Sequence, residues 1–510
     1  MSISGFQLLS LTVIASALLV YALVRRNGRQ LPPGPRGLPI IGNIFQLPSK
    51  DGWITYKAWG DQLDSDIIHL NLAGTPMIVL NSRKATHELL ERRSAIYSDR
   101  PRFRMLNDLM GFGWEFSFIP YGKAWKDRRK LFTQELQPPK SMLYRPRTLQ
   151  AARTLLERLL EKPDDYMWHL RHMSGDIILS TAYGIKIQVE DDPYVQLSEA
   201  ALKCEVVAAE WGYYLVDVFP ALRHLPSWLP GMTFKRQAKE WKRLSVAMLE
   251  VPFEYAKKSV MNGTANPSIA SSILDADGSS QGHEKELILR DVLATIYNAG
   301  ADTTVSALGT FFLAMLQNPE IQAKGQASVD VATAGDRLPD FNDVGSMPYV
   351  DAILKEVLRW KPVTPMAIPH RLMEDDTYEG YYIPAGSVVV GNAWAIMYDK
   401  EAYGPNTHLF LPDRFMQGNE LNPAIPHPDV AFGFGRRACP GQDIAWSSMW
   451  ITIASILATL KIEKARDENG CIIEPSGEYT SGMQTYPKPF KCSITPRSQK
   501  SAALINDCTS

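Results

Sequence analysis

The chain has 510 residues, 45% of them hydrophobic, and a formal net charge of −1 at pH 7. A near-neutral chain of this size can bury a large core, and its overall charge gives no reason to expect nucleic-acid binding. Its five cysteines are few and widely spaced, which predicts a reducing compartment and indicates neither a disulfide framework nor a zinc site.

The first predicted element is an uncharged, apolar run over residues 5–24. A run of about 20 residues is long enough to span the hydrocarbon core of a bilayer. Arg25, Arg26 and Arg29 follow it, whereas a cleaved secretory signal carries its positive charge before the apolar run. Residues 1–30 are therefore expected to form an uncleaved signal anchor with the bulk of the chain in the cytosol. A cleaved signal or a buried core helix is the alternative.

Proline-rich residues 31–40 should form a stiff hinge, and residues 41–510 a single domain. Strands are expected at 67–72, 77–80 and 362–369, with a hairpin over 381–390. Helices are expected at 82–92, 145–161, 165–183, 193–214, 285–317, 350–359 and 442–460.

Several of these elements carry local signals. Asp192 before Pro193 is a suitable N-cap. Residues 103–116 form an irregular apolar and aromatic segment, of the kind that covers a core or a pocket. Another helix opens at Trp125 and carries Arg129 one turn later on the same face. The basic residues around this pair ordinarily mean a solvated surface.

Two connections interrupt the helical pattern. Residues 225–236 are apolar, broken by prolines and edged by Lys235 and Arg236. They are expected to dip into a membrane surface at a substrate entrance; a buried loop between helices is the alternative. Residues 262–284 are polar at both ends and rich in Gly, Ser and Asn, which predicts a surface connection with a short helix at 268–274.

The long helix at 285–317 has an unusual middle, Ala299-Gly-Ala-Asp302-Thr303-Thr304. The glycine alone costs a helix about 1 kcal/mol. Such interruptions often mark functional sites, and a threonine hydroxyl can compete there for the carbonyl one turn back. The alternative is a tolerated polar kink.

Two signals follow this helix. Glu356 and Arg359 are spaced for an ion pair, a contact that is weak when it is exposed. The apolar, proline-rich stretch 362–369 should line a pocket and leads to His370, although a lone histidine is usually structural.

The stretch Phe432-Gly-Phe-Gly-Arg-Arg-Ala-Cys439-Pro-Gly441 carries the strongest signal. A thiolate before the helix at 442–460 would have its pKa lowered by the helix dipole and backbone N–H groups. The glycines admit a large flat ligand, and Arg436 and Arg437 offer charge to an anion. These features suit a haem with Cys439 as axial thiolate, although a lone cysteine is usually a small buried hydrophobe.

The pattern Phe432-x-x-Gly435-x-Arg437-x-Cys439-x-Gly441 resembles the haem-binding loop of the cytochrome P450 family. The resemblance covers nearly the whole chain, and its local style is similar to fungal members of secondary metabolism. It implies a mainly α fold with small β-sheets (α+β), the cytochrome P450 fold, with an N-terminal transmembrane helix.

The resemblance also implies roles for individual residues. Cys439 would be the axial ligand of the haem iron, and Asp302 and Thr303 would deliver protons to bound oxygen. Residues 479–484 would reach back into the pocket. Contacts to the haem would come from Trp125, Arg129, His370 and Arg437 at its propionates, and from Phe432, Gly435 and Gly441. A structural brace behind the cysteine loop would be formed by Glu356, Arg359 and Arg414.

The implied activity is haem b-dependent oxygen activation that hydroxylates or epoxidises a small lipophilic metabolite. No nucleotide or flavin fingerprint is present in the needed context, so electrons should come from a separate NADPH-dependent reductase, with cytochrome b5 as a further donor. Such a partner could dock on basic residues of the helix that opens at Trp125, namely Lys123, Lys126, Arg128 and Lys130. The expected location is the endoplasmic reticulum membrane, single-pass, facing the cytosol.

Two other functions stay open. A haem-thiolate isomerase or dehydratase would not need oxygen, and the Asp302-Thr303 pair argues against it. A non-enzymatic haem protein would not need the apolar segments expected to line a pocket. Those linings are predicted to be apolar with few charges, which suits a terpenoid, polyketide, aromatic or alkaloid substrate; they comprise residues 103–116, 204–214, 294–301, 363–368 and 481–484.

Overall fold

The computed structural model describes residues 29–210, 212–276 and 282–507. The predicted membrane run over residues 5–24 therefore lies outside the described residues. The longer helices are α2 (Gly52–Gln62), α5 (Lys123–Leu136), α6 (Arg145–Glu161), α7 (Tyr166–Tyr183), α8 (Pro193–Ala208), α10 (Thr233–Met261), α11 (Ile269–Ala276), α12 (His283–Gln317), α13 (Pro319–Thr333), α14 (Pro348–Trp360), α17 (Gln442–Thr459) and α18 (Gln499–Asp507). The short helices are α3 (Arg83–Thr86), α4 (Ser94–Tyr97), α9 (Leu215–Val218), α15 (Ala393–Met397) and α16 (Lys400–Tyr403).

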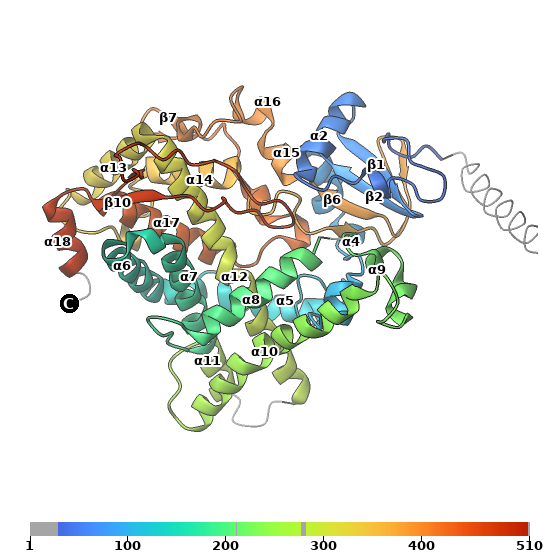
Figure 1. Cartoon of the computed structure of the whole chain (residues 1–510), viewed down its shortest axis with the longest axis horizontal. Helices are drawn as coiled ribbons and strands as arrows, with labels where there is room; N and C mark the ends of the chain where they lie inside the picture. Colours follow the sequence, from blue (N-terminus) through green and yellow to red (C-terminus); the bar gives the residue numbers. More distant parts are fainter. Residues whose placement is uncertain (1–28, 211, 277–281, 508–510) are drawn as a thin grey trace, which may run out of the picture.

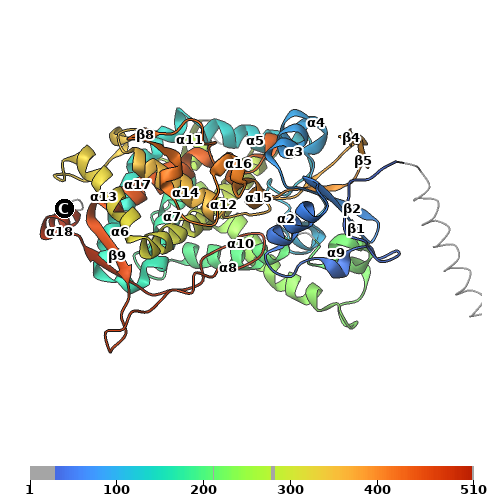
Figure 2. The same cartoon turned by 90° about the horizontal axis from the view of Figure 1, so that it is seen from above.

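Helices dominate and the sheets are small, as predicted (Figure 1). The strands are β1 (Ile67–Leu72), β2 (Thr75–Leu80), β3 (His370–Arg371), β4 (Asp376–Tyr378), β5 (Tyr381–Ile383), β6 (Val388–Gly391), β7 (Met416–Gln417), β8 (Glu420–Leu421), β9 (Leu460–Lys464) and β10 (Cys492–Pro496). The sheet with β1 and β2 lies at one end of the molecule and α18 at the other, as Figure 1 and Figure 2 both show.

Helix α12 forms the centre of the helical part. It packs against α5, α7, α8, α10, α14 and α17. Its length and composition would also suit a membrane span, but 78% of its most apolar stretch is buried inside the protein. It is therefore a core helix, and it carries residues 299–304 into the interior.

The sheet nearest the N-terminus has the order β1–β2–β6–β3, with β2 and β6 parallel. The predicted hairpin over 381–390 is wrong, because β5 pairs with β4 whereas β6 lies between β2 and β3. All residues of β6 are buried, which suits an inner strand covered on both faces. The predicted strand at 362–369 is also wrong; its prolines lack the N–H groups that a ladder needs.

Helix boundaries follow the local signals closely. The carboxylate of Asp192 caps α8 by accepting the N–H groups of Tyr194 and Val195, as predicted. Helix α8 ends at Ala208, earlier than expected, and the chain turns at Gly212, whose φ is +90°. The predicted helix at 82–92 consists of α3 followed by a π-helical turn, and the short helix expected at 268–274 is α11.

Candidate active site

The cysteine loop, residues 432–441, leads directly into α17. The N–H of Cys439 donates to the carbonyl of Phe432 at 2.7 Å, which closes the loop. Gly435 has a φ of +53°, and a Cβ there would lie 2.0 Å from the carbonyl oxygen of Leu90. Only glycine allows this approach, so Gly435 has a packing role beside its predicted cofactor contact.

The thiol of Cys439 is accessible, yet protein surrounds it closely enough for burial to raise its pKa. The backbone N–H of Gly441 and the guanidinium of Arg129 oppose this effect. Both groups lower the pKa of Cys439, as predicted, but burial raises it by more. The predicted lowering of the thiol pKa is therefore wrong. A thiol that is both accessible and enclosed lines an internal space, which is where an axial haem ligand must lie.

Helix α5 brings two predicted residues to this loop. Arg129 donates to the carbonyl of Ala438 at 2.6 Å. Trp125 is buried, and the guanidinium carbon of Arg437 lies 4.5 Å from the centre of its ring. The common face predicted for Trp125 and Arg129 is confirmed, because both contact the cysteine loop.

Arg128 on the same helix is not part of a free basic surface. It forms an ion pair with Asp291 at 2.6 Å, and both side chains are largely buried. Lys123, Lys126 and Lys130 are exposed. Lys123 pairs with Asp127 at 2.7 Å, so the predicted docking surface is reduced mainly to Lys126 and Lys130.

Three buried basic side chains gather beside the loop: Arg100, His370 and Arg437. The Nδ1 atom of His370 lies 2.7 Å from the carbonyl oxygen of Tyr97. Within the part of the chain that the structure describes, the two arginines donate to backbone carbonyls alone. Arg437 donates to Ser98 (2.8 Å), Phe116 (3.2 Å) and Ile119 (2.9 Å), and Arg100 donates to Ser117 (2.9 Å), Ile368 (2.7 Å) and Pro369 (2.9 Å).

Burial is the main cause of the lowered pKa values in this group. It holds the pKa of Arg100 and His370 well below their usual ranges, and neighbouring guanidinium groups lower both further. Burial also lowers the pKa of Arg437 to about 9, although Asp99 opposes this. The oxygens of Asp99 are held by Arg371 (3.0 Å) and by a backbone N–H. Within the described residues, Arg100 and Arg437 are buried cations without a dedicated carboxylate, which favours an anionic ligand. The imidazole of His370 lies beside them, so the donor set fits the propionates of a haem.

Sequence analysis missed Arg100. Its signal was the charged Asp99-Arg100 pair immediately before Pro101. Because its partners are backbone carbonyls from distant segments, no residue type elsewhere in the sequence indicates its burial.

Helix α12 is continuous from His283 to Gln317, and only its burial is interrupted at the predicted stretch. Between residues 291 and 316, the residues that are not buried are Ala299, Gly300, Asp302 and Thr303. The Thr303 hydroxyl donates to the carbonyl of Ala299 at 3.0 Å, which confirms the predicted bond one turn back. Accessible residues in the middle of a buried helix mark the wall of an internal space.

Gly300 has a packing role as well. A Cβ there would lie 2.6 Å from Cδ1 of Ile178 on α7. The hydroxyl of Ser174, also on α7, donates to the Gly300 carbonyl at 2.9 Å. A side chain at position 300 would therefore require the Ile178 side chain to shift, so glycine suits the close contact of α7 and α12.

Asp302 has polar partners on two sides. It accepts a hydrogen bond from the Tyr486 hydroxyl, and the Nε of Arg171 lies 3.9 Å from its other oxygen. Arg171 also pairs with Glu199 at 3.1 Å. Burial raises the pKa of Asp302, while Tyr486 and Arg171 oppose the rise. A hydrogen-bonded carboxyl with a raised pKa is suited to proton exchange.

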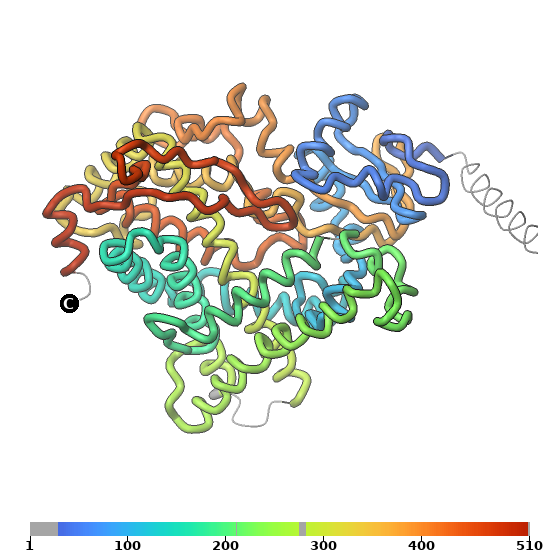
Figure 3. The backbone as a smooth tube through the Cα atoms, viewed as in Figure 1, coloured from blue at the N-terminus to red at the C-terminus, as the bar shows by residue number. Residues whose placement is uncertain are grey.

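A cavity of about 590 Å³ opens beside Asp302. Residues from α7, α8 and the segment between β9 and β10 line it. Figure 3 shows this C-terminal segment returning to the middle of the molecule. Its Thr485 N–H donates to the carbonyl of Val363 at 2.8 Å, and buried Gln484 lines the cavity.

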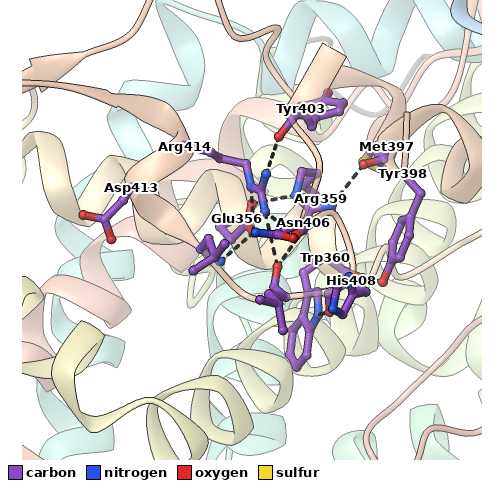
Figure 4. Close-up of polar contacts among 12 residues, drawn as sticks. Glu356, Arg359, Trp360, Met397, Tyr398, Tyr403, Asn406, His408, Asp413 and Arg414 are labelled. Atoms are coloured by element: carbon purple, nitrogen blue, oxygen red, sulfur yellow. Dashed lines mark hydrogen bonds and ion pairs between the residues drawn. The ribbon is translucent and has the colours of Figure 1, made fainter. Parts of the chain in front are cut away.

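The predicted brace is assembled as expected (Figure 4). Glu356 accepts from Arg359 at 2.6 and 2.8 Å and from Arg414 at 3.1 Å. It also accepts the N–H of Leu411 at 2.8 Å. The guanidinium groups reach the carbonyls of Met397, Tyr403, Asn406 and Leu409. The cluster thus ties together residues 397–414, which lead toward the cysteine loop.

Comparison with known proteins agrees with this arrangement. A family model described as Cytochrome P450 matches residues 32–493. Cytochrome P450 monooxygenase 98 of Postia placenta is 44% identical over 96% of this chain and 95% of its own length. Tryptamine 4-monooxygenase of Psilocybe cyanescens is 39% identical over 96% and 98%. Cytochrome P450 monooxygenase claR of Ampulloclitocybe clavipes is 40% identical over 97% and 91%.

Proposed function

The chain belongs to the cytochrome P450 family and is a monooxygenase, and we propose that it hydroxylates or epoxidises a small lipophilic metabolite of fungal secondary metabolism. The observation that carries the proposal is the enclosed but accessible thiol of Cys439 beside buried cations. When bound, a haem supplies oxygen activation. The metabolite belongs to the terpenoid, polyketide, aromatic or alkaloid classes.

Each residue then has a defined task. Cys439 would ligate the iron of a bound haem, and Arg100, His370 and Arg437 would hold its propionates. The Thr303 hydroxyl positions a proton on the accessible stretch of α12. Asp302 exchanges protons with the cavity beside its carboxyl group. Trp125, Arg129, Phe432 and Gly441 shape the cofactor site, and the brace formed by Glu356, Arg359 and Arg414 supports the preceding chain.

We further propose that a separate NADPH-dependent reductase supplies the electrons. Lys123, Lys126 and Lys130 are exposed on α5, the helix whose Arg129 contacts the cysteine loop. A positive patch at this place would steer an acidic partner toward the cofactor.

Residues 1–30 are proposed to anchor the enzyme in the endoplasmic reticulum membrane, followed by the hinge 31–40 and one catalytic domain over 41–510. The exposed apolar side chain of Trp228, 79% accessible, supports membrane contact by the 225–236 loop and argues against its burial between helices. Helix α9, which precedes this loop, lies at the same end of the molecule as β1 and β2 (Figures 1 and 2).

The test is reconstitution of the full-length chain in membranes with a reductase, NADPH and a fungal metabolite extract. We expect products heavier by one oxygen atom that disappear when NADPH or oxygen is left out. A product that forms without either would instead identify a haem-thiolate isomerase or dehydratase. A matched preparation of Cys439→Ser should form no product.

A further inference from the structure

Two carboxyl groups meet an amide inside the segments that were expected to be an apolar pocket lining. The Nδ2 of Asn298 donates to Oε2 of Glu115 at 2.8 Å and to Oε2 of Glu205. The two glutamates also hydrogen-bond to each other. Their exposed fractions are 3% for Glu115, 4% for Glu205 and 1% for Asn298. We call these three residues the acid cluster.

The acid cluster lacks a counter-ion. Burial is the first cause that raises the pKa of both glutamates, and each feels the other's carboxyl group. Two carboxyls in such contact share a proton, so the pair carries no more than one negative charge. Among residues 29–210, 212–276 and 282–507, no lysine, arginine or histidine forms an ion pair with Glu115 or Glu205. The amide of Asn298 offers only neutral N–H groups.

The acid cluster also contains an unpaired hydrogen-bond acceptor. The Oδ1 atom of Asn298 is buried and has no hydrogen-bond partner within the described part of the chain. Buried polar atoms are nearly always paired, so an unpaired one needs an explanation. Two carboxyls and a free amide oxygen at one place form a site that lacks a donor and a positive charge.

The acid cluster borders the internal space on α12. Asn298 comes directly before Ala299, the first accessible residue in the buried stretch of the helix, and lies one turn from Asp302. Glu205, on the neighbouring α8, is close enough to Tyr486 to raise the pKa of that phenol. Tyr486 is the residue that donates to Asp302.

The third member comes from another segment of the chain. Glu115 belongs to the irregular segment before α5, and the next residue, Phe116, accepts a hydrogen bond from Arg437 of the cysteine loop. The acid cluster is therefore continuous in sequence with the accessible part of α12, through Asn298, and with a residue that contacts the cysteine loop, through Glu115.

We propose that Glu115, Glu205 and Asn298 bind a protonated amine of the substrate, so that the lipophilic metabolite carries a basic nitrogen. The proposal rests on the monooxygenase function proposed above. An ammonium group offers both the N–H donor and the charge that the cluster lacks, whereas a hydrocarbon or a ketone offers neither. Asn298 is five residues from Thr303, about 7.5 Å along the helix axis, so an amine held here would direct the adjoining carbon skeleton along residues 299–303.

The test compares binding of amines with binding of their uncharged counterparts. Full-length holoenzyme is titrated with a panel of tertiary arylalkylamines, beginning with N,N-dimethyl-2-phenylethylamine. Each is paired with its carbon isostere, here 3-methylbutylbenzene, and with the corresponding alcohol. Binding is followed by the substrate-induced shift of the Soret band, without turnover. We expect at least one amine to bind at least tenfold more tightly than its isostere and its alcohol, a difference of about 1.4 kcal/mol.

Matched variants assign this preference to the acid cluster. Because the pair shares a proton, a single glutamine substitution can leave its negative charge in place. The test therefore uses the double variant Glu115→Gln/Glu205→Gln, which should reduce the preference below threefold and leave the affinity for the isostere unchanged. Glu240→Gln on α10 removes the same charge from a side chain that is 70% exposed, and it should keep the full preference. Asn298→Ala replaces the double variant if the latter fails to incorporate haem, and the same loss is expected.

The proposal is wrong if no amine in the panel is preferred by the wild-type enzyme, or if the preference survives in every cluster variant. The acid cluster would then be a self-contained buried network. Failure of the monooxygenase proposal is seen separately, as product formation that does not require oxygen. Amine binding is measured without turnover and so does not depend on that result.

Discussion

Replacement of Glu356 by glutamine should strongly destabilise the protein. The side chains of Glu356 and Arg359 are 0% exposed and that of Arg414 is 7% exposed. Glutamine keeps the size of the side chain but removes its charge, so two buried guanidinium groups lose their carboxylate. Breaking a buried ion pair by removal of one partner costs about 3–5 kcal/mol.

This loss converts into a measurable shift of the unfolding temperature. An unfolding entropy of about 2.1 cal/mol/K per residue gives roughly 1 kcal/mol/K for a domain of this size. The midpoint of the holoenzyme should therefore fall by about 3–5 °C. Scanning calorimetry of wild type and variant at one scan rate measures the difference.

A neighbouring ion pair provides the control. Lys324 pairs with Asp413 at 2.6 Å, but the two side chains are 53% and 49% exposed. Exposed pairs contribute little to stability, so Lys324→Ala should leave the midpoint almost unchanged. If Glu356→Gln lowers the midpoint no more than Lys324→Ala does, the argument for a buried brace is refuted.

Three further substitutions test the site and its surroundings. Cys439→Ser should abolish the carbon monoxide spectrum of a thiolate-ligated haem, and an unchanged spectrum would remove Cys439 as the iron ligand. Thr303→Ala should keep the haem but consume NADPH without matching product; normal coupling would exclude the hydroxyl from proton delivery. Burial raises the pKa of Asp217, which accepts the N–H of Met105 at 3.0 Å, to about 7. Because the ionised carboxylate is disfavoured in the folded state, this group should lower stability by about 2–3 kcal/mol between pH 5 and pH 8. Asp217→Asn should remove that part of the pH dependence of the unfolding free energy, measured by urea unfolding. If the unfolding free energy changes equally with pH in variant and wild type, the assignment is contradicted.

Local signals were sufficient for much of the fold. Helix α6 has the predicted bounds, and α8 begins at its predicted cap because Asp192 and Pro193 act within a few residues of each other. The brace was also predictable, although Glu356 and Arg359 alone were weak evidence. The family pattern supplied Arg414, and the structure confirms the contact.

Features that depend on distant segments were not predictable in the same way. Strand β6 pairs with β2 across some 300 residues of chain, and this long-range pairing overrides the local hairpin signal around the Pro-Ala-Gly turn. Likewise Glu115 and Glu205 lie in two segments that are mostly apolar, and each alone would be expected to turn toward solvent. Their shared proton and their contact with Asn298 arise only when three elements meet.

The segment 115–117 connects the two charged regions of the interior. The side chain of Glu115 joins the acid cluster, whereas the carbonyls of Phe116 and Ser117 accept from Arg437 and Arg100. One short stretch of backbone therefore positions a group proposed to hold the substrate. It also accepts hydrogen bonds from the two arginines proposed to hold the cofactor. A backbone shift in 115–117 cannot move one region without moving the other, so cofactor binding should order the acid cluster before a substrate arrives. Substrate selection by this enzyme would then depend on an interior that its cofactor helps to organise.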